Sequence, residues 1–313
     1  MKFLLKLLAA ASLACAAAGA SAQAHVADAE RCLSITNNPD LAIQFCTRAI
    51  ESGRIAGADL ARLHFSRGVE WAAKTDFERA IADYDAAIRL SPSFADAFYN
   101  RGNAWANRGD PDRAIADYDA AIRLNPKDIA PYVGRAVELT LKGEYARAIA
   151  DYETALKSNA KSDDAHFGRG RARFYTGDYP GAIADFEQAV KLEPNAYTPI
   201  WLYFARKRAG AAGAEEALDG DSRNYRSSSW PGTLVVFLLG RTDANSVLAA
   251  ATDPDPRMQR ENRCEANFYI AQWHLLRGQQ AQALPLLNNA ASDCPKHIVE
   301  YEGAVAELRR LQR

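Results

Sequence analysis

A repeat of 34 residues is the feature that most constrains the fold of this chain. Aligning the sequence on itself at a shift of 34 residues gives agreement over four consecutive units. The units begin near Ala61, Ala95, Ile129 and Asp163. A period of this length is typical of arrays in which each unit packs on its neighbours. We therefore expect a stack of similar structural units over this stretch.

Each unit carries the same residue classes at the same positions. The eighth, twentieth and twenty-seventh positions hold small residues, which let two helices touch, and the twenty-fourth is aromatic. In the four units the eighth position holds Gly68, Gly102, Ala136 and Gly170, and the twenty-fourth holds Tyr84, Tyr118, Tyr152 and Phe186. Proline stands at the thirty-second position of three units, where it cannot continue a helix. Apolar residues at three- and four-residue spacing predict two helices per unit, and so an all-α chain of helical hairpins.

This pattern resembles the tetratricopeptide repeat, which has small residues at positions eight, twenty and twenty-seven, an aromatic residue at twenty-four and proline at thirty-two. The resemblance covers about 130 residues in uninterrupted register. It implies an α-solenoid of tetratricopeptide-type hairpins that binds other proteins. The flanks extend the pattern less regularly. We expect a signal peptide, a degenerate N-terminal hairpin, four repeats, a degenerate helical region, and a C-terminal repeat with a capping helix, at residues 1–22, 23–60, 61–196, 197–263 and 264–313.

The first residues have the features of a secretory signal peptide. Residues 1–22 contain two early lysines, a short apolar stretch and small residues at the end, with cleavage expected near Ala22 or Ala24. The apolar stretch is too short to span a membrane. We therefore expect a periplasmic or secreted protein. Cys15 leaves an outer-membrane lipoprotein as the alternative, although Leu13 lies two residues before it, and the lipoprotein pattern has leucine three residues before.

Four cysteines remain after the signal segment, namely Cys32, Cys46, Cys264 and Cys294. In an antiparallel hairpin, residues equally far from the turn lie side by side. The first two cysteines are equally far from one predicted turn, and the last two from another. We therefore expect each pair to form a disulfide that clamps a terminal hairpin. A redox or metal-binding role would need CxxC-like spacing or histidines nearby, which the sequence lacks.

Composition and motifs argue against several classes of function. The chain has 38 basic and 39 acidic side chains, so neither a nucleic acid nor a membrane surface is an expected partner. Motifs for a nucleophilic serine or a phosphate loop are missing. The five histidines, His25, His64, His166, His274 and His297, have no metal-ligand spacing. We expect no catalytic residue, no cofactor and no metal. An enzyme would have to use the degenerate residues 197–256.

One charge pattern recurs with the repeat. Arginine fills the seventh position and aspartate the twenty-third, at equal distances from the turn. The pattern comprises Arg67, Arg101, Arg135 and Arg169 with Asp83, Asp117, Asp151 and Asp185. We interpret it as a ladder of structural ion pairs in preference to a strip of basic ligand-binding residues.

The resemblance also indicates where a partner would bind. In tetratricopeptide repeats, the first helices line a concave face, and positions two, five, nine, twelve and thirteen point into it. The candidate groove residues are Arg62, Phe65, Val69, Asp96, Tyr99, Asn103, Asn107, Val133, Val137, Phe167, Arg171, Phe174 and Tyr175. Their aromatic centre suits an extended or helical segment with apolar anchors better than an acidic chain terminus. The alternative is that some of them fill hairpin interfaces or are covered by another part of the chain.

Export, repeats and terminal disulfides together resemble exported bacterial envelope tetratricopeptide-repeat proteins and, loosely, NlpI-type lipoproteins. This resemblance implies a non-catalytic scaffold or adaptor, often a homodimer, that recruits envelope proteases or peptidoglycan hydrolases. The alternative hypothesis is a docking subunit of an envelope export or polysaccharide assembly machine.

Overall fold

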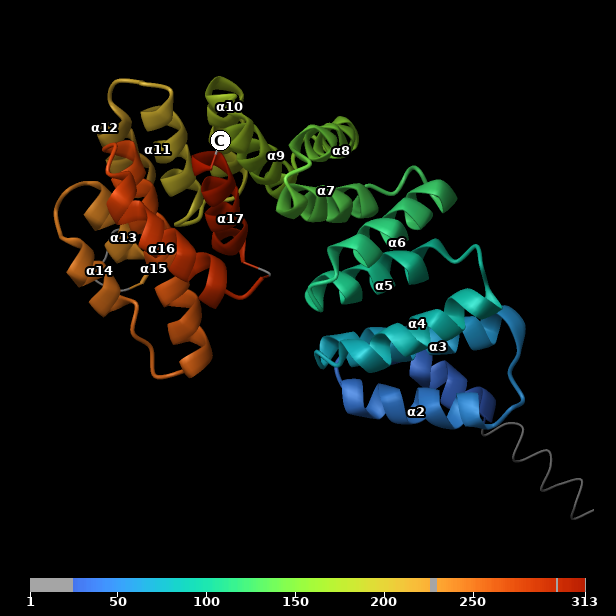
Figure 1. Ribbon diagram of the computed structural model, residues 1–313. Coiled ribbons are helices and arrows are strands. Elements are labelled where there is room, and N and C mark those ends of the chain that lie inside the picture. The colour runs from blue at the N-terminus through green and yellow to red at the C-terminus, as the bar shows by residue number, and fades with distance from the viewer. Residues whose placement is uncertain (1–24, 226–229, 297, 313) are drawn as a thin grey trace, which may run out of the picture. The chain divides into compact units, whose positions relative to one another are not determined.

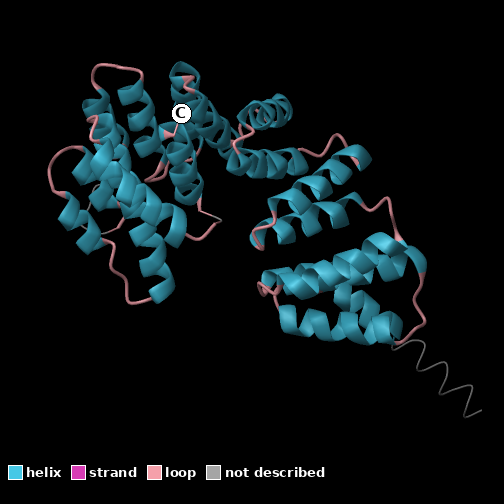
Figure 2. Cartoon of the chain, viewed as in Figure 1, coloured by secondary structure: helices cyan, strands magenta, loops and turns pink. Residues whose placement is uncertain are grey.

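A computed structural model describes residues 25–225, 230–296 and 298–312 (Figure 1). Over these residues the regular structure is helical, and Figure 2 draws no strand in them. The predicted all-α class is thereby confirmed. The expected signal peptide, Cys15 and His297 lie outside the described residues. Among the described helices, none combines the length and the apolar character that crossing a membrane requires.

The chain divides into two compact units, with the boundary between Pro131 and Tyr132. The N-terminal unit begins with a helix that covers residues 25–34 of the described chain. It continues with α2 (Pro39–Glu51), α3 (Gly57–Ala73), α4 (Phe77–Leu90), α5 (Ala95–Asn107) and α6 (Pro111–Leu124). Helices α3 and α4 pack as one hairpin and α5 and α6 as the next, and α4 packs on α5. This unit is a stack of antiparallel hairpins.

The C-terminal unit begins within α7 (Ala130–Lys142). It continues with α8 (Tyr145–Ser158), α9 (Asp163–Thr176), α10 (Tyr179–Leu192), α11 (Thr198–Arg208), α12 (Ala214–Asp221), α13 (Gly232–Leu238), α14 (Ala244–Ala250), α15 (Pro256–Leu276), α16 (Gln280–Asp293) and α17 (Val299–Leu311). Helices α9 and α10 form a hairpin, as do α15 and α16. The last helix, α17, packs on both α15 and α16.

The turn inside each repeat has a consistent cause. The fifteenth position is left-handed in all four repeats, as Thr75, Gly109, Gly143 and Gly177, with φ of 60°, 75°, 79° and 85°. Such a residue ends a helix by reversing the backbone direction. The next residue is an aspartate in three repeats, and its side chain accepts a hydrogen bond from the backbone N–H three residues on. Two consecutive residues therefore determine where the first helix of a repeat ends and where the second begins.

Small and aromatic residues interlock between the two helices of a repeat. A Cβ atom built on Gly102 would lie 2.8 Å from Cε1 of Tyr118, and one on Gly170 would lie 2.8 Å from Cε1 of Phe186. Each ring occupies the space that the missing side chain leaves. The recurring classes at positions eight and twenty-four are therefore a packing requirement.

Helix α11 explains why the repeat pattern fades after residue 197. All residues from Thr198 to Ala205 are buried. Trp201 is 1% exposed, and its ring lies 5.7 Å from the rings of both Phe174 and Phe268. A helix that is buried on every side shows no alternation of polar and apolar faces. The irregular stretch is therefore the centre of the largest core of the C-terminal unit.

Candidate partner-binding surfaces

The four predicted arginine–aspartate pairs are all formed. In each pair the arginine Nε and Nη2 atoms donate to the two oxygens of the same carboxylate. The Nε and Nη2 distances are 2.8 and 2.8 Å for Arg67–Asp83, 2.8 and 2.6 Å for Arg101–Asp117, 2.8 and 2.6 Å for Arg135–Asp151, and 2.9 and 2.6 Å for Arg169–Asp185. The prediction of an ion ladder across the hairpins is confirmed.

Two of these arginines also join neighbouring hairpins. Arg101 donates from Nη1 to Asp85 of α4 at 2.5 Å, and Arg67 donates from Nη1 to Thr47 of α2 at 3.0 Å. Burial alone raises the pKa of Asp83. Hydrogen bonds from Arg67 and then His64 outweigh burial and lower that pKa below its ordinary value of 3.8. The ladder side chains are therefore engaged in holding the stack together.

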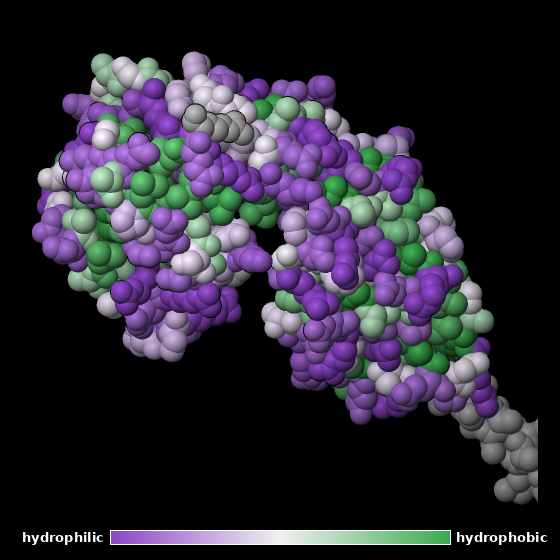
Figure 3. Space-filling view, in the orientation of Figure 1, coloured by the Kyte–Doolittle hydropathy of each residue, from purple (hydrophilic) through white to green (hydrophobic). Residues whose placement is uncertain are grey.

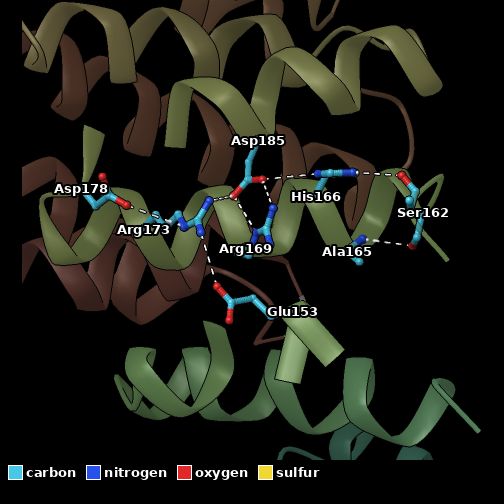
Figure 4. A network of polar contacts seen from close by, with 9 residues as sticks. Glu153, Ser162, Ala165, His166, Arg169, Arg173, Asp178 and Asp185 are labelled. Carbon is cyan, nitrogen blue, oxygen red and sulfur yellow. Dashed lines mark hydrogen bonds and ion pairs between the residues drawn. The ribbon is translucent and has the colours of Figure 1, made fainter. Parts of the chain in front are cut away.

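Figure 4 shows the same arrangement around Asp185. This carboxylate accepts hydrogen bonds from Arg169 and from Nη1 of Arg173, the latter at 2.8 Å, and His166 lies 3.3 Å away. Arg173 also pairs with Glu153 of α8 at 3.5 Å. His166 and its counterpart His64, which contacts Asp83 at 2.8 Å, thus have structural partners.

The N-terminal unit keeps its candidate groove residues accessible. Arg62, Asp96 and Asn107 are exposed. Half-buried between them are Phe65, Val69, Tyr99 and Asn103. Figure 3 shows hydrophobic and hydrophilic side chains mixed on the visible face of this unit. The predicted inner face of α3 and α5 therefore offers partly exposed aromatic surface with polar groups beside it.

The side chains at the centre of this face are held in place by their neighbours. The Phe65 ring lies 4.8 Å from that of Phe94, and the Tyr99 ring lies 6.0 Å from that of Tyr118. The Tyr118 hydroxyl donates to Oδ1 of Asn103 at 2.8 Å. Such ordered side chains lose little conformational entropy when a partner binds.

The candidate groove residues of the C-terminal unit are less uniformly accessible. Val137 is 37% exposed, while Val133, Phe167 and Tyr175 are half-buried. Arg171 is 3% exposed and Phe174 is 2% exposed. Both are covered by other parts of the same chain, as the alternative interpretation of these residues anticipated.

Helix α17 is one of the covering elements. Glu302 of α17 pairs with Arg171 of α9 at 3.1 Å. Glu307 of α17 pairs at 2.6 Å with Arg208 of α11, and the Arg208 guanidinium lies 4.9 Å from the centre of the Phe174 ring. Sequence reasoning expected a capping helix here but missed these acidic contacts. Their signal is weak, because glutamates on a terminal helix are usually solvent-exposed.

Both predicted cysteine pairs lie at disulfide distance. Cys32 and Cys46 have Cα atoms 4.8 Å apart, and Cys264 and Cys294 have Cα atoms 5.2 Å apart. All four side chains are buried. The bonds are consistent with an oxidising compartment.

Comparisons with known proteins agree with the repeat geometry. Residues 72–129 and 142–197 match the family model described as "Tetratricopeptide repeat". A comparison of the sequence with curated proteins found no match. Proteins of this family generally mediate protein–protein interactions.

Solved structures resemble the chain in fold. A tetratricopeptide repeat protein from Parabacteroides merdae aligns with a TM-score of 0.58 at 14% identity, covering 91% of this chain and 99% of that one. The C-terminal part of a repeat-containing protein from Cytophaga hutchinsonii aligns with a TM-score of 0.53 at 18% identity, covering 85% and 95%. MamA from Desulfovibrio magneticus aligns with a TM-score of 0.50 at 17% identity, covering 55% and 94%. These likenesses agree with the fold, and the family-model match, together with the hairpins and their interlocked positions, identifies residues 72–129 and 142–197 as tetratricopeptide repeats.

Proposed function

We propose that the chain is a non-catalytic scaffold that binds an extended or helical segment of a partner protein on the inner face of α3 and α5. The observation that carries this proposal is the half-buried Tyr99 between exposed Asp96 and Asn107. An aromatic side chain that is partly packed and partly accessible is a frequent anchor in protein interfaces. Phe65 and Arg62 extend the same surface onto the preceding repeat.

The chemistry of this face defines the segment it would take. The rings of Phe65 and Tyr99 favour an apolar anchor on the partner. The side chains of Arg62, Asp96 and Asn107 can form hydrogen bonds with the partner's backbone or polar side chains. The exposed charges of Arg62 and Asp96 are opposite in sign. The face therefore has no bias toward a strongly acidic or strongly basic segment.

The proposed location is the bacterial periplasm. The signal-like residues 1–22 support it, and so do the two buried disulfides, because such bonds persist in oxidising compartments. The resemblance to envelope adaptors suggests envelope proteases or peptidoglycan hydrolases as the proteins that this scaffold recruits, and it also suggests a homodimer.

Cross-linking in cells followed by mass spectrometry tests this proposal. The tagged, exported chain is compared with the double variant Tyr99→Ala and Asn107→Ala, which removes one anchor and one polar contact from the proposed face. The control is Arg123→Ala with Lys127→Ala, two exposed residues beyond that face. We expect envelope hydrolases or proteases with the unaltered chain and the control, and their loss with the double variant.

Two results would count against the proposal. Equal capture by the double variant would exclude the inner face of α3 and α5 as the binding surface. Recovery of a membrane assembly complex alone would favour a docking subunit of an export or polysaccharide assembly machine. Circular dichroism of each variant establishes that the hairpins remain folded.

A further inference from the structure

Helix α17 packs against the other helices of the C-terminal unit in the way that a bound helix would. One of its sides is buried and comprises Glu300, Glu302, Gly303, Ala304, Ala306 and Glu307. The polar contacts of its buried glutamates come from α9, α11 and α15, and the helix also packs on α16. Both α9 and α15 are the first helices of their hairpins, so α17 lies partly on the first-helix side. In a repeat array this is the side that receives ligands. The chain's own last helix therefore occupies that position.

Acidic side chains are the main polar contacts of α17. Glu302 pairs with the buried Arg171, and Glu307 pairs with Arg208 and accepts from Nε2 of Gln272 at 3.2 Å. The Tyr269 hydroxyl donates to Oε1 of Glu300 at 2.7 Å. Charged hydrogen bonds of this kind are directional and set both the register and the identity of a bound helix.

The surface also restricts the size of the residue at one position of α17. A Cβ atom added to Gly303 would lie 2.5 Å from the Phe268 ring and 2.7 Å from the Tyr175 hydroxyl oxygen. Any side chain larger than hydrogen would push the helix away. The surface therefore takes a helix with glycine at this position and glutamates one residue before and four residues after it.

The fit of α17 leaves several buried polar atoms unsatisfied. Nε and Nη1 of Arg171, Oε1 of Glu302, and the hydroxyl of Tyr175 have no hydrogen-bond partner in the described chain. Leaving a buried polar group unpaired costs about 1–3 kcal/mol. In addition, burial and then the nearby Glu302 raise the pKa of Glu138 to about 7. A helix that pairs more completely with Arg171 would be held more tightly than α17.

We propose that this face is a second helix-binding site, that α17 occupies it in the resting chain, and that a partner helix with the glutamate and glycine spacing of α17 displaces it. The inference rests on the proposed scaffold function and adds the chemistry of one partner. The partner is an amphipathic helix with a pattern like EYEGAVAE, which stands in this chain at residues 300–307. Capture of such a partner would require release of α17.

A peptide of residues 298–312 serves as the probe, and its binding is measured by fluorescence anisotropy. It is added to the unaltered full chain and to two full-chain variants that unseat α17. Gly303→Leu does so by steric overlap, and Glu302→Gln with Glu307→Gln does so by removing both ion pairs. The surface that receives the helix is unchanged in both variants. A second peptide with the two glutamine substitutions tests the role of the glutamates.

We expect the natural peptide to bind both variants at least about tenfold more tightly than the unaltered chain, where tethered α17 competes at high effective concentration. The glutamine peptide should bind the variants at least about tenfold more weakly than the natural peptide. The control Glu51→Gln with Glu78→Gln removes two exposed carboxylates from the N-terminal unit and should behave as the unaltered chain does.

Three results would overturn the proposal. They are the absence of peptide binding to folded variants, equal binding of both peptides, and loss of helical circular dichroism in both variants, since the last would make α17 a fixed part of the core. None of these results depends on Tyr99 or Asn107. If the peptide experiment fails, the cross-linking experiment on the N-terminal unit therefore still tests the scaffold function independently.

Discussion

Arg101 and Asp117 face each other across the α5–α6 hairpin and share two hydrogen bonds, of 2.8 and 2.6 Å. Asp117 is 6% exposed. The pair therefore lies where water screens charges poorly, and losing one member leaves the other charge buried. This distinguishes it from the ion pairs on the outer surface.

Replacing Asp117 by asparagine should lower the free energy of unfolding by about 1–3 kcal/mol, because Arg101 would lose the carboxylate that takes two of its hydrogen bonds and would keep only Asp85, whose side chain is 40% exposed. Urea unfolding followed by circular dichroism measures the change. Glu78→Gln is the matched control, since Glu78 is 79% exposed and lies 3.4 Å from Arg108. It should change stability by less than about 0.5 kcal/mol. Equal effects of both variants would contradict a structural role for the ladder.

Gly170 should not tolerate even a methyl group. Gly170→Ala would place a Cβ atom 2.8 Å from the Phe186 ring and is expected to cost about 1–3 kcal/mol of unfolding free energy. Gly220→Ala is the control, because nothing lies within 4 Å of the added atom. It should be neutral or stabilising by up to about 1 kcal/mol. Thermal melting of both variants checks this, and a neutral Gly170→Ala would refute the packing explanation of position eight.

Thr75 should gain from replacement by glycine. It has φ of 60°, whereas the equivalent Gly109 reaches 75° without a side chain. A left-handed backbone costs a residue with a side chain about 1–2 kcal/mol, and the greater freedom of glycine in the unfolded chain offsets about half of that gain. Thr75→Gly should therefore raise the free energy of unfolding by about 0.5–1 kcal/mol. The reverse change, Gly109→Thr, should lower it. A stabilising Gly109→Thr would show that the turn does not require this conformation.

The sequence was sufficient to predict the repeats because their determinants are local. Gly102 opposite Tyr118 and Arg101 opposite Asp117 follow from equal distances to one turn, which the period reveals. The helices after residue 197 were harder to predict. Trp201 lies in a helix buried on all sides, so its surroundings depend on contacts with Phe268, far along the chain.

Dependence on distant contacts also explains why some candidate groove residues are accessible and others are covered. Tyr99 is half-buried in α5 and remains accessible, as its repeat position predicts for a groove residue. Arg171 occupies in α9 the position that Asn103 has in α5, but its burial depends on Glu302, 131 residues later. No local pattern reports such a contact, and a glutamate in a terminal helix usually indicates exposure to solvent. Tertiary packing of α17 therefore decides which part of the array remains open.

Glu265 should make stability depend on pH. Its Oε2 atom accepts from the Tyr197 hydroxyl at 2.8 Å and from Nε1 of Trp230 at 3.1 Å. Burial, and then the nearby Glu300, raise the pKa of Glu265 from its ordinary value of 4.5 to about 8. Between these two values the folded chain holds a proton that the unfolded chain has lost. The free energy of unfolding should therefore fall as the pH rises from about 4.5 to about 8, with a slope of at most about 1.4 kcal/mol per pH unit from this group.

Glu265→Gln should flatten this dependence, because glutamine can still accept both hydrogen bonds but carries no charge. Some slope should remain, since the pKa of Glu138 is also raised, to about 7. Urea unfolding at several pH values in this window provides the measurement. Glu216→Gln, which removes an exposed carboxylate, should leave the slope as it is in the unaltered chain. If Glu265→Gln and Glu216→Gln gave the same slope, Glu265 would be charged in the folded chain, and the interior near α15 would be more hydrated than its packing implies.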